Sequence, residues 1–153
     1  MQNIIFNTVI SEEYLPKNIL SDEFKKNKLV IIKSDTGTGK TTIITEFLKL
    51  NPGLNFLSIA SRVTLSIEHH RIFNNKKIKS QHYKNEFLDD DKGLCVQLES
   101  IYKIFNTYNQ EKISNSILIL DEIKSFIQHL ITSPTVKDKK QTMMKFFFNQ
   151  SVV

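Results

Sequence analysis

Residues 34–42 read Ser-Asp-Thr-Gly-Thr-Gly-Lys-Thr-Thr and follow closely on the apolar run 29–32, Leu-Val-Ile-Ile. A strand, a glycine-containing loop and a helix that begins near Lys40 form the arrangement of a phosphate-binding loop. Gly37 and Gly39 permit positive φ and a close approach of the backbone to a ligand. Successive N–H groups at the start of a helix then form a site for an anion. The sequence predicts a nucleotide site here, and the alternative is a strand-to-helix turn with a chance Gly-Lys-Thr.

The residue types in this loop predict how individual side chains would bind a nucleotide. Lys40 is expected to reach the β- and γ-phosphates of ATP, and the Thr41 hydroxyl to be a ligand of Mg²⁺. One position departs from the consensus G-x-x-x-x-G-K-[ST], because Ser34 stands where the first glycine belongs. We expect the ATP site to be formed by Ser34, Asp35, Thr36, Gly37, Thr38, Gly39, Lys40, Thr41 and Thr42.

A second motif places two acids after an apolar strand. Residues 117–120 are Ile-Leu-Ile-Leu and are followed by Asp121 and Glu122. In a parallel sheet, the carboxyl end of this strand lies at the edge where ligands bind, beside the phosphate loop. Asp121 is then expected to hold Mg²⁺ together with Thr41, and Glu122 to orient or deprotonate the attacking water. Lys40 and Glu122 are thus the predicted catalytic residues. The alternative is a helix start with acids near the positive end of its dipole.

The spacing of apolar residues changes repeatedly between the period of a strand and that of a helix. Residues 74–92 show no clear period. Strands that alternate with helices indicate an α/β fold, with a mostly parallel sheet flanked by helices. We expect an N-terminal arm and short helix at 1–27 and one lobe at 28–153. Within these, strands are predicted at 28–33, 54–60, 93–97 and 116–121, and helices at 21–24, 41–50, 61–73, 99–105, 122–131 and 136–149.

Composition narrows the class of protein. The chain has 153 residues, of which 40% are hydrophobic and 24% charged, as is typical of a single globular domain. Its apolar runs fall far short of the ~20 residues of a membrane span, and the N-terminus lacks the pattern of a secretory signal. The single Cys95 excludes an internal disulfide and lies in a predicted buried strand. These features predict an intracellular protein, cytoplasmic or nuclear, with no membrane partner.

The net charge of +5 permits a polyanionic partner without requiring one. A basic stretch between residues 71 and 84 could extend an electrostatic track, but such a run is more often a solvated loop. It consists of Arg71, Lys76, Lys77, Lys79 and Lys84. The histidines show no metal-ligand spacing with cysteine or acids, so no zinc site is predicted. They are His69, His70, His82 and His129.

With both motifs placed, the chain resembles the superfamily-two helicases, and within them the herpesvirus-type replication origin-binding proteins and their relatives in large DNA viruses. The resemblance rests on residues 34–42 and on three further stretches in the family's order. These are 58–66 (Ser-Ile-Ala-Ser-Arg-Val-Thr-Leu-Ser), 96–101 (Val-Gln-Leu-Glu-Ser-Ile) and 120–125 (Leu-Asp-Glu-Ile-Lys-Ser). It implies a RecA-like P-loop NTPase lobe over 28–153 and the ATPase chemistry of a DNA helicase that acts in replication.

The same resemblance implies contacts to single-stranded DNA. Ser61 and Arg62 come just after the second predicted strand, where such helicases grip the DNA backbone. Arg62 is expected to make a charge-assisted contact to a phosphate, and Ser61 or Thr64 a hydroxyl contact. Gln97 and Ser100 follow the third strand and are expected to touch the same DNA strand. The alternatives are a solvated arginine at a helix start and a simple helix cap by Ser100.

A motor of this kind also needs a second lobe that supplies an arginine finger, and a segment that couples hydrolysis to movement. Neither is visible before Val153. We therefore expect the chain to be the first part of a motor, with a second helicase lobe as its partner and weak activity alone. Two other functions stay open. One is another P-loop ATPase, such as a packaging or remodelling motor, and the other is a non-catalytic module that binds nucleotide or DNA.

Overall fold

The computed structural model describes residues 10–24, 30–33, 35, 37–89, 91–105, 111–112 and 115–137. The chain divides into two compact units, residues 1–50 and 51–153. The phosphate-loop sequence belongs to the first unit, and every strand of the described residues belongs to the second. No helix in the described part of the chain combines the length and the apolar character needed to cross a membrane.

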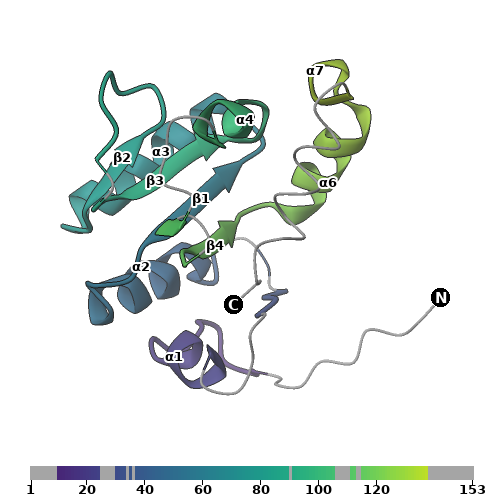
Figure 1. Ribbon diagram of the computed structural model, residues 1–153. Helices are drawn as coiled ribbons and strands as arrows, with labels where there is room; N and C mark the ends of the chain where they lie inside the picture. The colour runs from purple at the N-terminus through teal and green to yellow at the C-terminus, as the bar shows by residue number, and fades with distance from the viewer. Residues whose placement is uncertain are drawn as a thin grey trace. The chain divides into compact units, whose positions relative to one another are not determined.

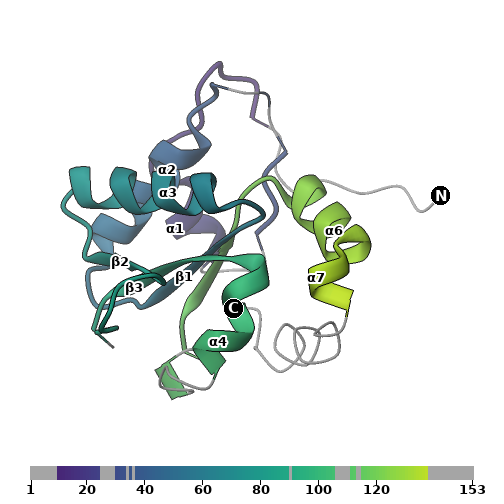
Figure 2. The same cartoon turned by 90° about the horizontal axis from the view of Figure 1, so that it is seen from above.

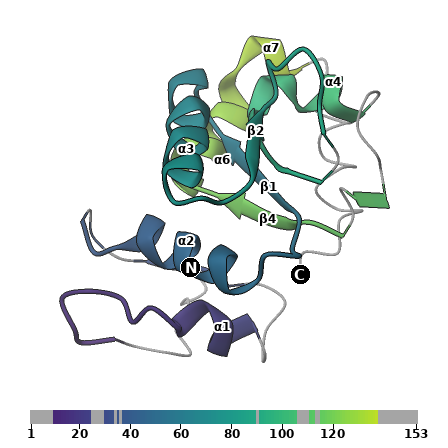
Figure 3. The same cartoon turned by 90° about the vertical axis from the view of Figure 1, so that its left-hand side faces the viewer.

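Among its described residues, the first unit contains two helices, α1 (Ile19–Phe24) and α2 (Lys40–Leu50). They lie side by side, as Figure 3 shows. The rings of Phe24 and Phe47 pack against each other with their centroids 5.2 Å apart. This aromatic contact joins the end of one helix to the middle of the other.

Helix α2 is amphipathic, as its sequence predicts. Ile43, Phe47 and Leu48 are all buried, and Ile43 and Phe47, four residues apart, lie on the same face, whereas Lys49 and Leu50 are exposed. The helix ends before residues 51–53, Asn-Pro-Gly, which favour a turn. The helix predicted at 41–50 is therefore confirmed, with one additional residue at its start.

The strand predicted at 28–33 is wrong for the residues that can be compared. Positions 30–33 adopt no regular secondary structure, and Ile31 is 65% exposed; positions 28 and 29 lie outside the described residues. An apolar run shows only that a segment can be buried. A strand also needs a neighbouring strand to satisfy its N–H and C=O groups, and the described residues of this unit contain none.

The second unit is built on a four-stranded sheet in the order β2-β3-β1-β4, with every neighbouring pair parallel (Figure 1). This confirms the prediction of an α/β fold with a parallel sheet. The RecA-like form of that fold stays a prediction. The strands are β1 (Phe56–Ala60), β2 (Ser80–His82), β3 (Gly93–Gln97) and β4 (Ile117–Leu120).

The three longer strands are paired in a register that places their carboxyl ends at the same height in the sheet. Ala60 of β1 pairs with Gln97 of β3, and Ile59 pairs with Leu120 of β4. Whatever follows these strands therefore emerges at one edge of the sheet. In β1 every residue is buried, whereas all four residues of β4 are only half-buried.

Helices cover both faces of this sheet. Figure 2 shows α3 on one side and α4 on the other. The face opposite α3 also receives side chains from α6 and α7. The bounds of these elements are α3 (Val63–Asn75), η1 (Leu98–Ser100, a 3-10 turn), α4 (Ile101–Phe105), α6 (Ile123–Thr132) and α7 (Pro134–Lys137).

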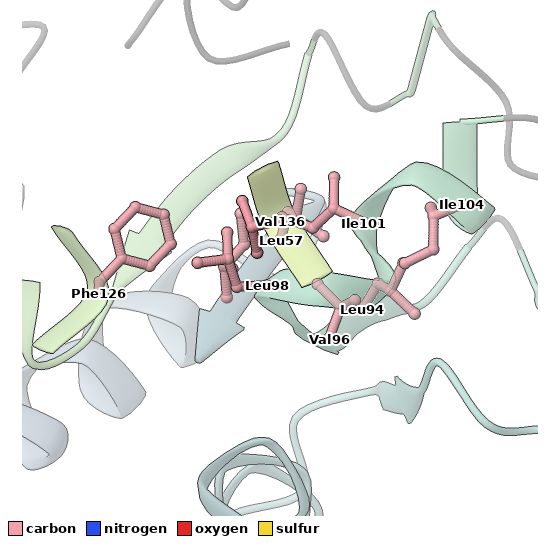
Figure 4. Close-up of a cluster of buried hydrophobic side chains, with 9 residues drawn as sticks. Leu57, Leu94, Val96, Leu98, Ile101, Ile104, Phe126 and Val136 are labelled. Atoms are coloured by element: carbon pink, nitrogen blue, oxygen red, sulfur yellow. The ribbon is translucent and has the colours of Figure 1, made fainter. Parts of the chain in front are cut away.

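The apolar core of this unit lies on the face opposite α3 (Figure 4). Its side chains come from strands β1 and β3, from η1 and α4, and from α6 and α7, so burial of their apolar surface holds the sheet and these helices together. The cluster consists of Leu57, Ile59, Leu94, Val96, Leu98, Ile101, Ile104, Phe126 and Val136.

Alternation along β1 makes the two faces of the sheet chemically different. Leu57 and Ile59 enter the apolar cluster, whereas Phe56 and Ser58 contact side chains of α3. Cys95 pairs with Ser58 in register and is fully buried, and its burial raises the pKa of the thiol to about 12. The prediction that Cys95 is a small core residue is confirmed.

The structure differs from the predicted elements in two further places. Strand β2 falls within residues 74–92, where no strand was expected, because its residues are polar and yet buried. A helix was predicted at 136–149 after a break at Pro134, but Pro134 instead opens α7. Proline is well accommodated at the first position of a helix, where its missing N–H would have had no partner. Residues 138–149 of that prediction lie outside the described residues.

Gly93 is the position of the sheet least able to accept a side chain. A Cβ atom there would overlap the ring of Phe56. We expect Gly93→Ala to lower the free energy of unfolding by about 1–3 kcal/mol, measured by urea denaturation, because the packed interior must shift. Gly53→Ala is the matched control, since a Cβ at Gly53 meets nothing within 4 Å. Equal stability of the two variants would contradict this packing.

Candidate functional site

The phosphate loop adopts the backbone conformation that its glycines were expected to allow. Gly37 has φ 86° and Gly39 has φ 90°, a region that residues with a Cβ enter only at a cost. Helix α2 begins immediately after, with the N–H of Ile43 donating to the carbonyl of Gly39 at 3.0 Å. Ser34 and Thr36 lie outside the described residues. The loop-to-helix half of the predicted motif is therefore present, without a strand at residues 30–33.

Hydrogen bonds close the loop on the carbonyl oxygen of Asp35. Lys40 donates to it from Nζ at 2.6 Å, and Thr38 from its hydroxyl at 3.0 Å. The backbone N–H of Leu15 donates to the carbonyl of Thr38 at 3.1 Å. The N-terminal segment is thereby tied to the loop, and the Lys40 ammonium lies over the loop's own backbone.

This arrangement fits the phosphates of a nucleotide. Positive φ at alternate positions turns backbone N–H groups toward a common side, and the start of an eleven-residue helix adds a favourable dipole for an anion. The Lys40 ammonium is held beside them by a carbonyl that a phosphate oxygen can replace. Thr41 is half-buried and Thr42 exposed in the first turn of α2. The hydroxyl and ammonium groups suit a phosphate with bound Mg²⁺.

The two predicted acids follow β4 directly, and their environments differ. Asp121 is about two-thirds buried, and its Oδ1 accepts a hydrogen bond from the N–H of Glu122 at 2.9 Å. Its Oδ2 lies 3.2 Å from Nε2 of His69. Glu122 is exposed and has left-handed backbone angles, φ 49° and ψ 53°. Asp121 is therefore held in place by two donors, whereas the carboxylate of Glu122 is open to solvent.

The His69 contact was not predicted from the sequence. His69 belongs to α3 and is 95% buried, and its other ring nitrogen, Nδ1, lies 2.8 Å from the hydroxyl oxygen of Ser58. Ser58 belongs to β1, and Asp121 follows the neighbouring strand. A polar residue in the middle of an otherwise apolar strand is the one signal that pointed to a buried partner for Ser58.

The residues predicted to touch DNA lie where β1 ends and α3 begins. Arg62 is the N-cap residue of α3 and is exposed, as is Thr64. The side chain of Arg62 makes no capping hydrogen bond to this helix. Ser61 is only 3% exposed. Among the described residues, its hydroxyl is the one buried side-chain oxygen or nitrogen without a hydrogen-bond partner.

Gln97 and Ser100 come from the neighbouring strand β3 and the turn after it. Because Gln97 pairs in register with Ala60, it emerges beside Ser61 at the same edge of the sheet. Its side chain is already engaged: the Tyr83 hydroxyl donates to its Oε1 at 3.3 Å, and its Nε2 donates to Glu99 at 3.2 Å. Ser100 is 8% exposed. The structure thus brings the predicted DNA contacts together, with Arg62 and Thr64 the most accessible of them.

The α3 face of the sheet also carries a second group of polar side chains. Nε2 of His82 lies 3.0 Å from the Ser66 hydroxyl, and Nδ1 of His70 lies 3.1 Å from the Ser80 hydroxyl. Burial lowers the pKa of both histidines, and the charges of His70 and Lys84 lower that of His82 further. The described residues contain no group of three or more histidine, cysteine, aspartate or glutamate side chains able to hold a metal ion.

The basic residues between 71 and 84 are all exposed, and they extend from the end of α3 past strand β2. Lys77 adopts φ 60° at the turn after α3, and Lys84 lies 5.9 Å from the centre of the Tyr83 ring. Arg71 lies on α3, and the exposure of the four lysines that follow the helix agrees with the solvated-loop interpretation.

The left-handed backbone conformation of Glu122 can be tested by substitution. A left-handed residue with a Cβ costs about 1–2 kcal/mol, so Glu122→Gly is expected to be more stable than Glu122→Ala by about 1 kcal/mol. The order should reverse at Gln128, inside α6, where glycine is the poorer helix former. Chemical denaturation of the four variants measures both differences. A Glu122→Ala variant more stable than Glu122→Gly would contradict the left-handed conformation.

A comparison with family models gives a match that covers most of the chain. The family is described as "Origin of replication binding protein", and its model matches residues 13–149. That range includes the phosphate loop, the acids after β4 and the residues at the start of α3. No solved structure matches the chain.

Individual relatives agree with the family match. The replication origin-binding protein of human herpesvirus 6A is 26% identical over 148 residues, which cover 88% of this chain and 18% of the relative. A candidate replication origin-binding protein of Acanthamoeba polyphaga mimivirus is 29% identical over 135 residues, or 85% of this chain and 17% of the relative. This chain thus spans less than a fifth of the length of these relatives.

A protein of another kind is also similar. The guanylate kinase of Wigglesworthia glossinidia brevipalpis is 24% identical over 144 residues, which cover 82% of this chain and 66% of the kinase.

Proposed function

The chain belongs to the family of origin of replication binding proteins, and on that premise we propose that it is an ATP-binding and ATP-hydrolysing lobe of a DNA helicase that acts in DNA replication. One observation carries the nucleotide part of the proposal. Gly37 and Gly39 both have positive φ directly before α2, which begins at Lys40. This backbone suits a phosphate at the start of a helix.

The residues of the loop and the acids after β4 have complementary roles in this proposal. Lys40 exchanges its hydrogen bond to the Asp35 carbonyl for one to a phosphate oxygen. Thr41 and Asp121 supply the hydroxyl and carboxylate that hold Mg²⁺, the ion that neutralises charge on the transferred phosphate. Glu122 is exposed, so water reaches its carboxylate, which can orient that water and accept its proton.

The DNA part of the proposal rests on the start of α3. Arg62 is exposed and its side chain makes no capping hydrogen bond to α3, and the hydroxyl of Ser61 has no partner among the described residues. A phosphate of single-stranded DNA suits Arg62, because it offers several acceptor oxygens and a negative charge. The Ser61 hydroxyl is buried and is therefore the less accessible of the two groups. Thr64 is exposed on the first turn and suits a second contact.

The partner in the proposal is a second helicase lobe, contributed by the same polypeptide or by another. The relatives are more than five times as long as the matched region, so their sequences have room for such a lobe. Hydrolysis that depends on a second lobe would make this chain a weak ATPase by itself. We propose that it works inside the cell at sites of viral-type DNA replication.

Lys40→Ala tests the nucleotide site. We expect it to weaken binding of a fluorescent ATP analogue more than tenfold, because the ammonium is the one side-chain cation of the loop, while the circular dichroism spectrum stays unchanged. Lys49→Ala is the matched control in the last turn of the same helix, where the lysine pairs with Glu46 at 3.2 Å. If Lys40→Ala binds the analogue as the parent does, the nucleotide site lies elsewhere.

Arg62→Ala tests the DNA contact. We expect several-fold weaker binding of single-stranded DNA, and a slope of log K against log salt that is smaller by about 0.7, the value for one lost phosphate contact. Arg71→Ala provides the control, since Arg71 is exposed on the last part of the same helix. A salt slope that changes equally in both variants would point to the overall charge rather than to a contact at Arg62.

A second candidate function is phosphoryl transfer to a nucleotide, which the similarity to a guanylate kinase favours. One assay separates it from the first. ATP consumption is measured with no acceptor, with single-stranded DNA and with GMP. Stimulation by DNA with release of phosphate supports the helicase lobe, whereas formation of GDP from GMP supports the kinase. An ADP yield that neither addition changes would favour a P-loop ATPase of another kind.

A further inference from the structure

Three polar side chains from three separate elements form a continuous chain of hydrogen bonds. Ser58 of β1 lies 2.8 Å from Nδ1 of His69, and Nε2 of His69 lies 3.2 Å from Oδ2 of Asp121. Ser58 is fully buried and His69 is 5% exposed, while about a third of the Asp121 side chain is exposed. Only the Asp121 end of this chain therefore reaches the edge of the sheet.

The order serine, histidine, aspartate is that of a hydrolase triad, but the burial excludes this role. A nucleophilic serine must contact its substrate, and the Ser58 side chain lies inside the sheet with an exposed fraction of 0%. The accessible group here is the carboxylate. These hydrogen bonds therefore hold the Asp121 carboxylate in place, and Ser58 is their buried end.

The chemistry of the two contacts fixes where the protons lie. A carboxylate can only accept hydrogen bonds, so Nε2 of His69 carries the proton that it donates to Asp121. In a neutral ring Nδ1 is then an acceptor, and the Ser58 hydroxyl donates to it. The serine thus selects the ring form that has a donor facing Asp121. The N–H of Glu122 holds the other carboxylate oxygen.

We propose that His69 is a positioning residue for the metal-binding carboxylate: held by Ser58, it orients Asp121 toward Mg²⁺ and ties that carboxylate to helix α3. This inference rests on the proposed function, in which Asp121 holds the metal ion. Partners of metal-binding carboxylates commonly change metal affinity by about 10–100-fold when they are removed. His69 itself touches neither the metal ion nor the nucleotide in this proposal.

Two substitutions separate the contacts of His69. The amide of glutamine extends to about the position of Nε2, so His69→Gln keeps a donor near Asp121. The amide of asparagine is one carbon shorter and lies near the position of Nδ1, so His69→Asn keeps a partner for Ser58 and loses the donor to Asp121. His129→Asn is the matched control, because His129 makes an equivalent contact to Glu99 at 3.0 Å.

The measurement is the Mg²⁺ concentration that gives half-maximal binding of a fluorescent ATP analogue to the 153-residue chain. We expect His69→Asn to raise it about tenfold, and His69→Gln and His129→Asn to stay close to the parent. A second readout needs no nucleotide. Long-range ¹H–¹⁵N spectra of the parent's histidine rings should show the proton of His69 on Nε2.

The outcomes distinguish the two proposals. If the parent binds the analogue in a Mg²⁺-dependent way and His69→Asn keeps the parent's Mg²⁺ dependence, the role of His69 is refuted while the proposed function stands. A proton on Nδ1 in the spectra refutes it as well. If the parent shows no Mg²⁺-dependent binding, the proposed function fails, and the role of His69 fails with it. Rescue by glutamine with failure of asparagine supports the proposal, since both variants bury an amide at the same position.

Discussion

The parallel register of β1 with its two neighbours is the constraint on which the candidate site depends. Because Ala60 pairs with Gln97 and Ile59 with Leu120, three strands end at one level. Ser61 and Asp121 therefore emerge at the same edge of the sheet, although they are far apart in the sequence. A register shift of one residue would turn every side chain of the moved strand to the opposite face and separate Ser58 from His69.

The two faces of this sheet are packed by different kinds of contact. On one face, apolar side chains from the strands and the following helices form a core that excludes water (Figure 4). On the other, α3 is held by the aromatic pair Phe56 and Phe73 and by polar contacts, among them Ser58 with His69 and Ser66 with His82. Such contacts need defined distances and directions, so α3 is fixed in its orientation as well as packed. The helix that presents Arg62 at its start is the same helix that contacts Asp121 two turns later.

Patterns of apolar residues predicted most of the regular elements in the described residues. The helix at 41–50 and the strands at 93–97 and 116–121 carry a clear period, and the structure contains them with shifts of one residue or less at each end. Strand β2 could not be found this way, since buried Ser, Gln and His residues look like a loop in the sequence. The strand predicted from the apolar run at 29–32 was wrong over residues 30–32 for the opposite reason, because apolar character alone does not supply a neighbouring strand.

The sequence predicted the motif residues of the candidate site, but it did not predict most of the contacts that surround them. The glycines of the loop and the two acids stand out in the sequence because their chemistry is tied to fixed spacing. The contact between His69 and Asp121 joins residues 52 positions apart, so no local pattern contains it. The burial of Ser61 likewise depends on packing at the end of β1. Long-range contacts of this kind decide which of the predicted residues are accessible.

The histidines that line α3 make one face of the sheet sensitive to acid. The pKa values of His70 and His82 are lowered from the ordinary value of 6.5 in the folded chain. As the pH falls below 6.5, the unfolded chain takes up protons at these rings more readily than the folded chain, so the free energy of unfolding decreases. The apolar face contains no titrating group among its clustered side chains. The loss of stability on acidification is therefore expected to come from the α3 face of the sheet and not from the hydrophobic core.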